Sequence, residues 1–288
     1  MRLMLFVPVI AVGAVLSQTA AATSPEWVRF PSADAELNDG KPTSLNAAVY
    51  RPGGDWVGKG PFPAVVALHG CGGLGTKAEP VSPRHADWGQ RLADLGYIVV
   101  MPDSFSSRGM GSQCTTKART VRPGRERTRD AAGARLWLQA LPDVDKSRVS
   151  LLGWSNGGST VLYAASRTAP KFPGPDFHKA VAFYPGCRLP AAADNVPRLP
   201  MLLLIGLADN WTPAAPCREF DAKARAAGGS VTLVTYDGAY HDFDHPNSPV
   251  RERTGLAFTG DDSGRAFLGT NPAARADALI RVPKFLAD

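Results

Sequence analysis

The 288-residue sequence carries 32 Lys and Arg residues against 26 Asp and Glu residues, which gives a net charge of +6. Because this surplus is small and no nucleic-acid motif accompanies it, we expect no nucleic-acid partner. The one basic concentration, residues 117–130, could steer anionic substrates or contact a polyanion, but we interpret it as a solvated loop followed by the first turns of a helix. No internal repeat, low-complexity tract or Ser/Gly linker interrupts the chain, which argues against a repeat array.

The N-terminal segment has the pattern of a secretory signal peptide. A single arginine precedes an apolar run over residues 3–16, and the small residues 20–22 follow it. The run is shorter than the roughly 18–20 residues that cross a bilayer, so a retained anchor is the weaker alternative. We therefore expect removal of residues 1–22 and one domain over residues 23–288. We also expect that the mature chain is not attached to a membrane and that its location is periplasmic or extracellular.

Short apolar runs alternate with segments of helical spacing along the chain. The runs predict buried strands over residues 62–70, 97–104, 148–155, 179–186, 200–209 and 230–238. The segments between them predict helices over residues 85–96, 125–141, 156–168 and 216–228, with a last candidate, 272–288, disturbed by Pro283. Leading strands such as residues 44–52 are expected to be antiparallel.

This alternation predicts an α/β fold: a mostly parallel, doubly wound sheet of about eight strands with helices on both faces. In such sheets ligands bind at the carboxyl ends of the strands. The residues that follow the runs include His69 to Gly73, Asp103, Ser155, Cys187, Asp209 and His241. A nucleophile, an acid and a base therefore occur in the order Ser, Asp, His, which is the hydrolase order for this kind of sheet.

Ser155 lies in the G-x-S-x-G pattern "GWSNG", between a predicted strand and a predicted helix. The glycines have a steric cause, because the nucleophile of such a site occupies a sharp turn that leaves no room for side chains two positions away. The pattern alone is weak evidence, and the strand–turn–helix context strengthens it. The alternative is a serine that only caps the following helix.

A serine hydroxyl needs a base within hydrogen-bond reach, and we assign that role to His241. The competitor in the same loop is His245. We expect His85 and His178 at the starts of elements, on the opposite side of the sheet. A histidine in a loop can also be a surface residue without a role.

The base needs an acid that fixes its tautomer, and Asp209 follows the right strand for this role. Three other candidates, Asp237, Asp242 and Asp244, are too near His241 in sequence to reach its far ring nitrogen, and Asp103 precedes the serine. The alternative is an Asp209 that only caps a turn or helix.

The negative charge that develops on the substrate carbonyl must meet preorganised donors. We expect one donor from the backbone N–H of Asn156 and the other from the N–H of Cys71, in the glycine-rich stretch 69–75. A phosphate-binding interpretation of this stretch is poor, because no Gly-Lys-Ser/Thr or G-x-G-x-x-G spacing is present.

The chain has four cysteines, which in an exported protein favours disulfides. Three connectivities are possible. Because neighbouring strands bring the ends of their loops together, we predict the pairs Cys71–Cys114 and Cys187–Cys217. Each would stabilise the fold by about 3–4 kcal/mol in the loop-entropy model. The alternative is four buried free thiols.

Four motifs in the correct order resemble the dienelactone hydrolase family of the α/β-hydrolase superfamily, in particular its exported bacterial members: "PFPAVVALHGCGG", "GWSNGG", "LLLIGLADNWTPAAPC" and "YDGAYHDFDHP". The similarity runs from about Pro61 to the C-terminus. It implies a doubly wound sheet, a triad of Ser155, Asp209 and His241, and no metal or organic cofactor. The founding enzymes use a cysteine nucleophile on small cyclic lactones, whereas Ser155 stands here, so the dienelactone substrate does not transfer while ester hydrolysis does.

We therefore expect a secreted serine hydrolase that cleaves small-molecule esters or lactones through an acyl-enzyme. Aromatic residues near strand ends are candidates for an apolar acyl pocket, with core packing as an equal alternative: Trp154, Phe105, Tyr184 and Trp211. Arg108 could pair with a substrate carboxylate, although a surface position is favoured. The long segment 242–270 is expected to cover the entrance.

Two other functions are compatible with the same residues. One is a peptidase or an acyltransferase that uses the same triad. The other is a binding protein without activity that retains the fold, against which the complete triad argues.

Overall fold

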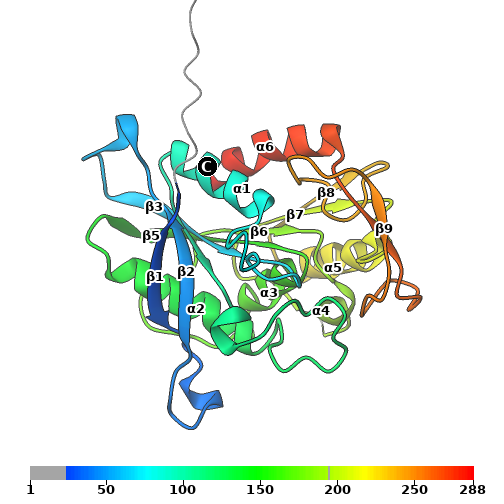
Figure 1. Cartoon of the computed structure of the whole chain (residues 1–288), viewed down its shortest axis with the longest axis horizontal. Helices are drawn as coiled ribbons and strands as arrows, with labels where there is room; N and C mark the ends of the chain where they lie inside the picture. Colours follow the sequence, from blue (N-terminus) through cyan, green and yellow to red (C-terminus); the bar gives the residue numbers. More distant parts are fainter. Residues whose placement is uncertain (1–23, 194) are drawn as a thin grey trace, which may run out of the picture.

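The computed structural model describes residues 24–193 and 195–288, so the predicted signal peptide lies outside the described residues. An eight-stranded sheet forms the centre of the molecule, in the order β1-β2-β4-β3-β5-β6-β7-β8 (Figure 1). Its strands are β1 (Glu26–Pro31), β2 (Ser44–Tyr50), β3 (Phe62–Leu68), β4 (Ile98–Pro102), β5 (Val144–Trp154), β6 (Ala180–Phe183), β7 (Met201–Gly206) and β8 (Val231–Tyr236).

The sheet is parallel from β4 to β8, and only β1 and β2 run antiparallel to their neighbours. The six runs predicted as strands all lie within this sheet, and the stretch 44–52 supplies the antiparallel strand β2. The predicted α/β class and the approximate strand number are therefore confirmed.

Helices cover both faces of the sheet, because each parallel pair needs a crossover connection. Figure 1 shows α1 and α6 over one face and α2, α3 and α5 over the other. The helices are α1 (Pro83–Asp94), α2 (Glu126–Ala140), α3 (Asn156–Ala164), α4 (Arg188–Ala192), α5 (Ala214–Ala226) and α6 (Pro272–Ala287), with short 3-10 turns η1 (Ala35–Leu37), η2 (Gly54–Trp56) and η3 (Ser106–Arg108).

The strand order creates a switch point between β3 and β5. The chain leaves β3 toward β4 on one side, whereas it leaves β5 toward β6 on the other side. Loops that diverge in this way open a crevice at the carboxyl ends of the two strands. The loop after β3 begins at His69 and the turn after β5 holds Ser155, so both predicted site segments border this crevice.

Helix α6 continues through Pro283, where the sequence indicated a disturbance. Its buried residues recur every fourth position, at Ala274, Ala278, Val282 and Leu286, and form a stripe against the core. A proline inside a helix costs about 3 kcal/mol. The packing of this stripe offsets that cost and holds the helix intact.

The segment 242–270 contains a small hairpin of β9 (Arg251–Arg253) and β10 (Ala266–Leu268) that the sequence did not predict. Leu256 and Ala266, from this segment, form a small hydrophobic cluster with Cys71, Cys114 and Trp211. The hairpin therefore packs against the loop that follows β3 and against the residues that follow β7.

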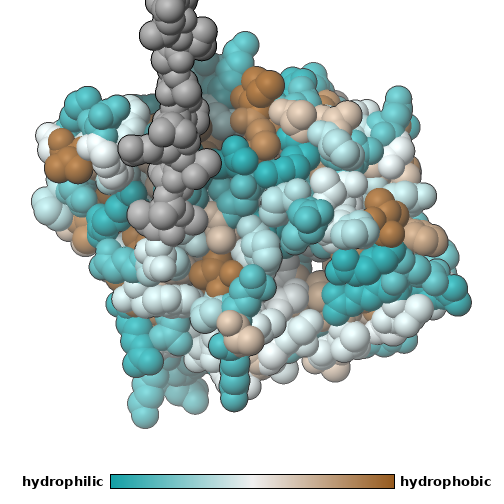
Figure 2. All heavy atoms as spheres, turned by 45° about the horizontal axis from the view of Figure 1, so that its top comes forward, coloured by the Kyte–Doolittle hydropathy of each residue, from teal (hydrophilic) through white to brown (hydrophobic). Residues whose placement is uncertain are grey.

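The surface offers scattered apolar side chains. On the face drawn in Figure 2, hydrophobic residues form separate small groups within a mostly hydrophilic and neutral surface, which is usual for a folded domain. Within residues 24–193 and 195–288, no helix has the length and hydrophobicity needed to span a membrane.

Candidate active site

Ser155 occupies a strained turn between β5 and α3. Its φ of +52° and ψ of −113° lie outside the regions that residues with side chains prefer. The flanking glycines have no room for a side chain: a Cβ on Gly153 would lie 2.4 Å from Gly157 O, and a Cβ on Gly157 would lie 2.0 Å from Leu68 O. Both glycines of the motif therefore have the steric cause expected from the sequence.

Asp209 follows β7 and is held by main-chain donors. Its Oδ1 accepts hydrogen bonds from the N–H groups of Trp211 and Thr212, each at 2.9 Å. Its Oδ2 accepts from the Thr212 hydroxyl at 3.0 Å. The carboxylate is buried and oriented, with Oδ2 directed toward the loop that follows β8.

His241 lies in that loop and meets Asp209. Its Nδ1–H donates to Asp209 Oδ2 over 2.7 Å, and both side chains are almost fully buried. The rings of Tyr184 and Trp211 flank the imidazole, with centroids 4.5 and 4.7 Å away. Gly269 N–H donates to His241 O at 2.9 Å, so the main chain at this position is also fixed.

The charges around His241 favour its protonated form. Burial by itself would lower the pKa of the imidazole, but the charge of Asp209 and the hydrogen bond to it outweigh burial and raise the pKa above 6.5. Asp242 adds to this increase, whereas the buried cation of Arg84 opposes it. A raised pKa fits a group that must hold a proton during a reaction.

The hydroxyl of Ser155 and the imidazole Nε2 of His241 form no hydrogen bond with any described residue. Nε2 is buried and has no hydrogen-bond partner among the described residues. The two residues are linked through β6: Ser155 N–H donates to Phe183 O at 2.9 Å, and the next residue, Tyr184, packs against the His241 ring. The predicted nucleophile and the predicted base therefore lie at the same edge of the sheet, after β5 and β8, and no hydrogen bond joins Ser155 Oγ to His241 Nε2.

Two other histidines, His245 and His85, form different contacts. His241, and not His245, forms the hydrogen bond with Asp209. Nδ1 of His245 instead accepts a hydrogen bond from Asn247 N–H. The expected position of His85 was wrong: its ring lies 5.0 Å from that of Trp154, beside the site. A helix that follows a strand begins at the carboxyl edge of the sheet, so the start of α1 lies on the same side as the site. His85 instead binds Leu74 O, and burial keeps its pKa well below 6.5.

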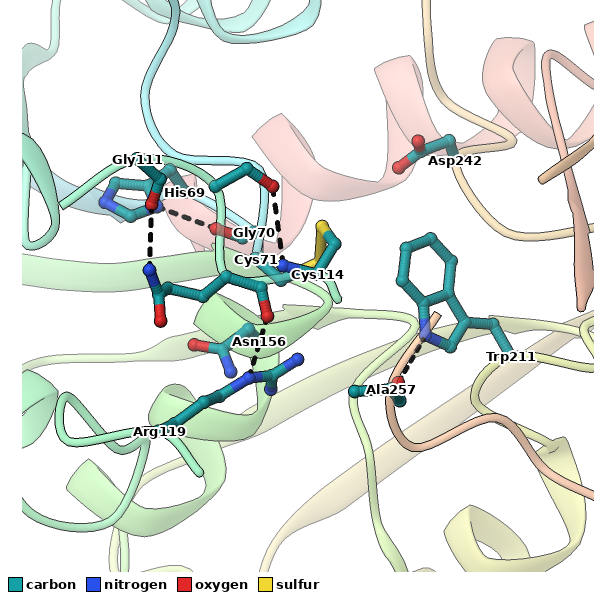
Figure 3. Close-up of a disulfide and its surroundings, with 12 residues drawn as sticks. His69, Gly70, Cys71, Gly111, Cys114, Arg119, Asn156, Trp211, Asp242 and Ala257 are labelled. Carbon is teal, nitrogen blue, oxygen red and sulfur yellow. Dashed lines mark hydrogen bonds between the residues drawn. A yellow bond between two sulfur atoms is a disulfide. The ribbon is translucent and has the colours of Figure 1, made fainter. Parts of the chain in front are cut away.

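The two main-chain N–H groups predicted to bind an oxyanion have no partner in the part of the chain that the structure describes. Among the described residues, neither the N–H of Cys71 nor that of Asn156 has a hydrogen-bond acceptor. The loop after β3 passes close to the nucleophile turn, because a Cβ on Gly70 would lie 3.6 Å from Ser155 Cβ. Figure 3 shows Asn156 below Cys71, with Trp211 and Asp242 at the right of the view.

Both predicted disulfides are present, Cys71–Cys114 and Cys187–Cys217, and the structure has no free cysteine among the described residues. The first fixes the loop that carries the Cys71 N–H. Figure 3 shows this disulfide. Cys71 O also accepts a hydrogen bond from Gln113 N–H at 2.8 Å, so the two segments are joined twice. Two disulfides suggest an oxidising environment outside the cytosol.

Comparisons with known proteins identify the family. The model of the dienelactone hydrolase family matches residues 45–288. The chain belongs to the dienelactone hydrolase family. A Methylorubrum extorquens protein named for carboxymethylenebutenolidase activity is 26% identical over 245 residues, which cover 81% of this chain and 79% of that protein. This dienelactone hydrolase family member is a carboxylic ester hydrolase.

Solved structures agree on the fold. The dienelactone hydrolase-like promiscuous phosphotriesterase P91, from metagenomic libraries, superposes with a TM-score of 0.67 at 19% identity over 92% of this chain and 98% of its own. Thermogutta terrifontis esterase 2, in a structure phosphoramylated by tabun, has a TM-score of 0.63 at 20% identity over 94% and 97% of the two chains. These similarities support the α/β-hydrolase architecture of the dienelactone hydrolase family member.

Two of the aromatic residues predicted to line an acyl pocket donate to a buried carboxylate. Asp244 accepts hydrogen bonds from Tyr184 Oη at 2.6 Å and from Trp154 Nε1 at 2.8 Å. A third donor to Asp244 is Trp88 Nε1, at 2.8 Å. Neither Tyr184 nor Trp154 exposes surface. Their polar atoms serve the core of the family member, which favours the packing alternative.

The other two aromatic residues pack against histidine rings. Trp211 packs against His241 and is 6% exposed, and it remains a candidate for contact with substrate. Phe105 is buried against the ring of His69, with centroids 4.8 Å apart.

Arg108 is neither a surface residue nor an unpaired cation. Its guanidinium binds the carboxylates of Asp34 and Asp130, at 2.8 Å for each pair. The sequence places Asp34 and Arg108 far apart, so this ion pair could not be anticipated. We therefore leave Arg108 out of the substrate site.

Three polar residues around the site were not predicted from the sequence. Thr212 Oγ1 lies 3.1 Å from His241 Nδ1 and 3.0 Å from Tyr184 O, which is an alternative to Asp209 Oδ2 as acceptor of its one proton. Arg84, buried in the first turn of α1, pairs with Asp242, and although burial raises the pKa of Asp242, Arg84 lowers it to about 2. The third, Arg127, lies within the basic run 117–130. The "DNWTP" motif around Thr212 was the only sequence signal for these residues.

Proposed function

We propose that this protein is a secreted serine esterase that acts through an acyl-enzyme, with Ser155 as the nucleophile, His241 as the base and Asp209 as the orienting acid. The observation that carries the proposal is the 2.7 Å contact between His241 Nδ1 and Asp209 Oδ2, which leaves the unpartnered Nε2 as the proton acceptor. The strained backbone of Ser155 at the same sheet edge supports it.

The reaction follows from these atoms. Ser155 Oγ attacks the ester carbonyl while its proton passes to His241 Nε2. The free N–H groups of Cys71 and Asn156 stabilise the oxyanion of the tetrahedral intermediate. His241 then protonates the leaving alkoxide, which leaves an acyl-Ser155 ester. A water molecule, deprotonated by His241, hydrolyses that ester and releases the acid.

Asp209 supplies orientation and charge. Its carboxylate holds the proton on Nδ1, so that Nε2 keeps the lone pair needed to accept the serine proton. It also stabilises the imidazolium that forms. In apo structures the hydrogen bond between nucleophile and base is often long, and it shortens when substrate binds.

The proposed substrates are small-molecule carboxylic esters and lactones. Trp211, beside His241, is proposed to contact the acyl group. Thermogutta terrifontis esterase 2 has been observed phosphoramylated by tabun and phosphorylated by paraoxon, and P91 is described as a phosphotriesterase. By analogy we propose that Ser155 reacts with organophosphorus electrophiles.

The proposal includes export and a single catalytic domain. The two disulfides support an oxidising location, periplasmic or extracellular, after removal of a signal peptide from residues 1–22. One hydrophobic core runs from Phe30 to Leu286, which supports a single domain over the mature chain.

Turnover of a panel of p-nitrophenyl esters of increasing chain length, with lactones and aromatic esters beside them, tests this function. We expect hydrolysis by the wild type and a loss of about 10⁴-fold or more in kcat for Ser155→Ala. Peptide cleavage in preference to esters, or turnover that rises with added alcohol acceptors, would favour the peptidase or acyltransferase alternative. Equal ester turnover by wild type and Ser155→Ala would refute the mechanism.

A further inference from the structure

Arg127 departs from the solvated position expected for the basic run 117–130. It lies in the first turns of α2 and exposes no surface. Its three nitrogens all bind polar atoms: Nη1 donates to Asn156 Oδ1 at 2.5 Å, Nη2 donates to His69 O at 2.8 Å, and Nε donates to Ser104 Oγ at 3.4 Å. A buried arginine with this many contacts has a defined structural task.

No carboxylate within residues 24–193 and 195–288 lies within 4.0 Å of the Arg127 guanidinium. The nearby carboxylates have other partners: Asp130 binds Arg108 and Ser32, and Asp103 binds Ser106. Burial lowers the pKa of Arg127 to about 10, so it stays protonated at neutral pH. Burying a charge without a counterion is costly. Asp130 and Asp103 favour the charged form from a longer distance. The fold therefore keeps a buried positive charge here without a carboxylate in direct contact.

The two strong acceptors of Arg127 belong to the two segments that carry the oxyanion donors. Asn156 supplies one donor through its N–H, and its side chain binds Arg127. His69 opens the loop that supplies the other donor, and its carbonyl binds the same guanidinium. Because a guanidinium is a rigid planar fork, these bonds fix the turn after β5 and the loop after β3 relative to each other.

The His69 ring completes the orientation of the second donor. Its Nε2 accepts from Ser104 N–H at 3.1 Å, so the proton lies on Nδ1, which donates to Gly70 O at 2.8 Å (Figure 3). Gly70 C=O and Cys71 N–H belong to one planar trans peptide and point in opposite directions. Holding Gly70 O toward the His69 ring therefore turns the Cys71 N–H away from it.

We propose that Arg127 is a positioning residue for the oxyanion hole: it joins the segments of Cys71 and Asn156 and places a buried positive charge beneath them. This inference rests on the proposed function of these two N–H groups. The charge stabilises the transition state, in which the carbonyl oxygen becomes negative, more than it stabilises the neutral ester.

The test compares Arg127→Lys and Arg127→Met with Arg135→Lys, which is a matched control. Arg135 lies on the same helix, is 3% exposed, and also binds main-chain carbonyls, but those belong to residues 172–175. For each variant we would measure Tm, kcat and KM on a short p-nitrophenyl ester, and Ki for a trifluoromethyl ketone, whose serine adduct carries an oxyanion. Ser155→Ala is assayed in parallel.

We expect Arg127→Lys to lower kcat about 10- to 100-fold, and Arg127→Met to lower it further, with KM changed less than about threefold. Ki for the trifluoromethyl ketone should rise by the same factor as kcat/KM falls. Arg135→Lys should lower Tm but leave kcat and Ki near the wild-type values. If Arg127→Met does not fold, Asn156→Ala, which removes one acceptor and keeps the N–H, should show a smaller change in the same direction.

An unchanged kcat and Ki in Arg127→Lys, together with an inactive Ser155→Ala, would overturn the role of Arg127 and leave the proposed function intact. Equal losses in the Arg127 and Arg135 variants would also overturn it, because they would indicate a general effect of stability. Wild-type turnover by Ser155→Ala would refute the proposed function and this inference together.

Discussion

Asp209 and His241 are 32 positions apart in the chain, and their side chains meet through a hydrogen bond of 2.7 Å between Oδ2 and Nδ1. The other carboxylate oxygen accepts two main-chain N–H groups, so the acid cannot rotate freely. This contact connects the loop after β7 with the loop after β8. It is the relationship on which the proposed chemistry depends.

Replacing Asp209 with Asn should lower kcat by about 10⁴-fold, because an amide NH₂ would favour the wrong imidazole tautomer. A role limited to capping would instead cost about 1 kcal/mol of stability and leave the rate nearly unchanged. Steady-state kinetics and thermal unfolding of the same sample distinguish these outcomes. Asp237→Asn, an exposed change in the same part of the chain, is the control and should leave both quantities unchanged.

The pH profile of kcat/KM should report His241. The base acts only when Nε2 is unprotonated, so activity should fall as the pH drops through the pKa of His241, with a midpoint above 6.5. Asp242 raises this pKa and Arg84 lowers it. Asp242→Asn should therefore move the midpoint to lower pH, and a shift to higher pH would contradict the assignment of the titrating group.

The same raised pKa has a consequence for stability. Protonated His241 is favoured in the folded state, so its contribution is fully present below pH 6.5 and is lost as the pH rises through the folded pKa. The difference in unfolding free energy between the wild type and His241→Gln should thus be larger in acid than in alkali. A difference that grows with increasing pH would show that the imidazole is held neutral.

The two disulfides should differ in their effect on rate. Removing either pair by double alanine substitution should cost about 3–4 kcal/mol of stability. Loss of Cys71–Cys114 should also lower kcat, because the loop that carries one oxyanion donor loses its link to the segment around Gln113. Loss of Cys187–Cys217 is the matched control. Equal kcat values in the two double variants would show that the Cys71–Cys114 disulfide has no specific effect on catalysis.

Asp244 should be essential for stability. Its carboxylate accepts three buried hydrogen bonds, from Tyr184, Trp88 and Trp154, and Asp244→Ala would leave all three donors unpaired. We expect a loss of about 3–5 kcal/mol, or roughly 10 °C in Tm. A stable variant with a raised KM would instead indicate that these aromatic residues bind substrate.

The fold follows closely from local sequence signals. The predicted strands from residue 62 to residue 209 are buried apolar runs, and such runs form the interior of a parallel sheet whatever their partners. The expectation of burial was wrong for β8, which lies at the edge of the sheet and buries only Val231. Pro283 and the hairpin of β9 and β10 show the limit of this reasoning. In α6 a stripe of tertiary contacts outweighs a local helix breaker, and the three-residue strands of the hairpin are too short to produce a pattern.

The candidate site likewise contains residues that local sequence signals predict and residues that they do not. Ser155, Asp209 and His241 each follow a recognisable strand, so the rule that strands of a parallel sheet end at one edge places them at the same edge. His85 was misplaced because that rule also brings helix starts to this edge. Arg127 could not be recognised, since a basic residue beside exposed basic residues has no local sign of burial. Its environment is created by the loop after β3, the loop after β4 and the turn after β5.

The most direct test of the catalytic account is labelling with a fluorophosphonate, followed by intact mass and peptide mapping. We predict one adduct per chain, on Ser155, with no labelling of Ser155→Ala and greatly slowed labelling of His241→Gln. An unlabelled, folded wild-type protein, or an adduct that persists at another residue in Ser155→Ala, would contradict the account.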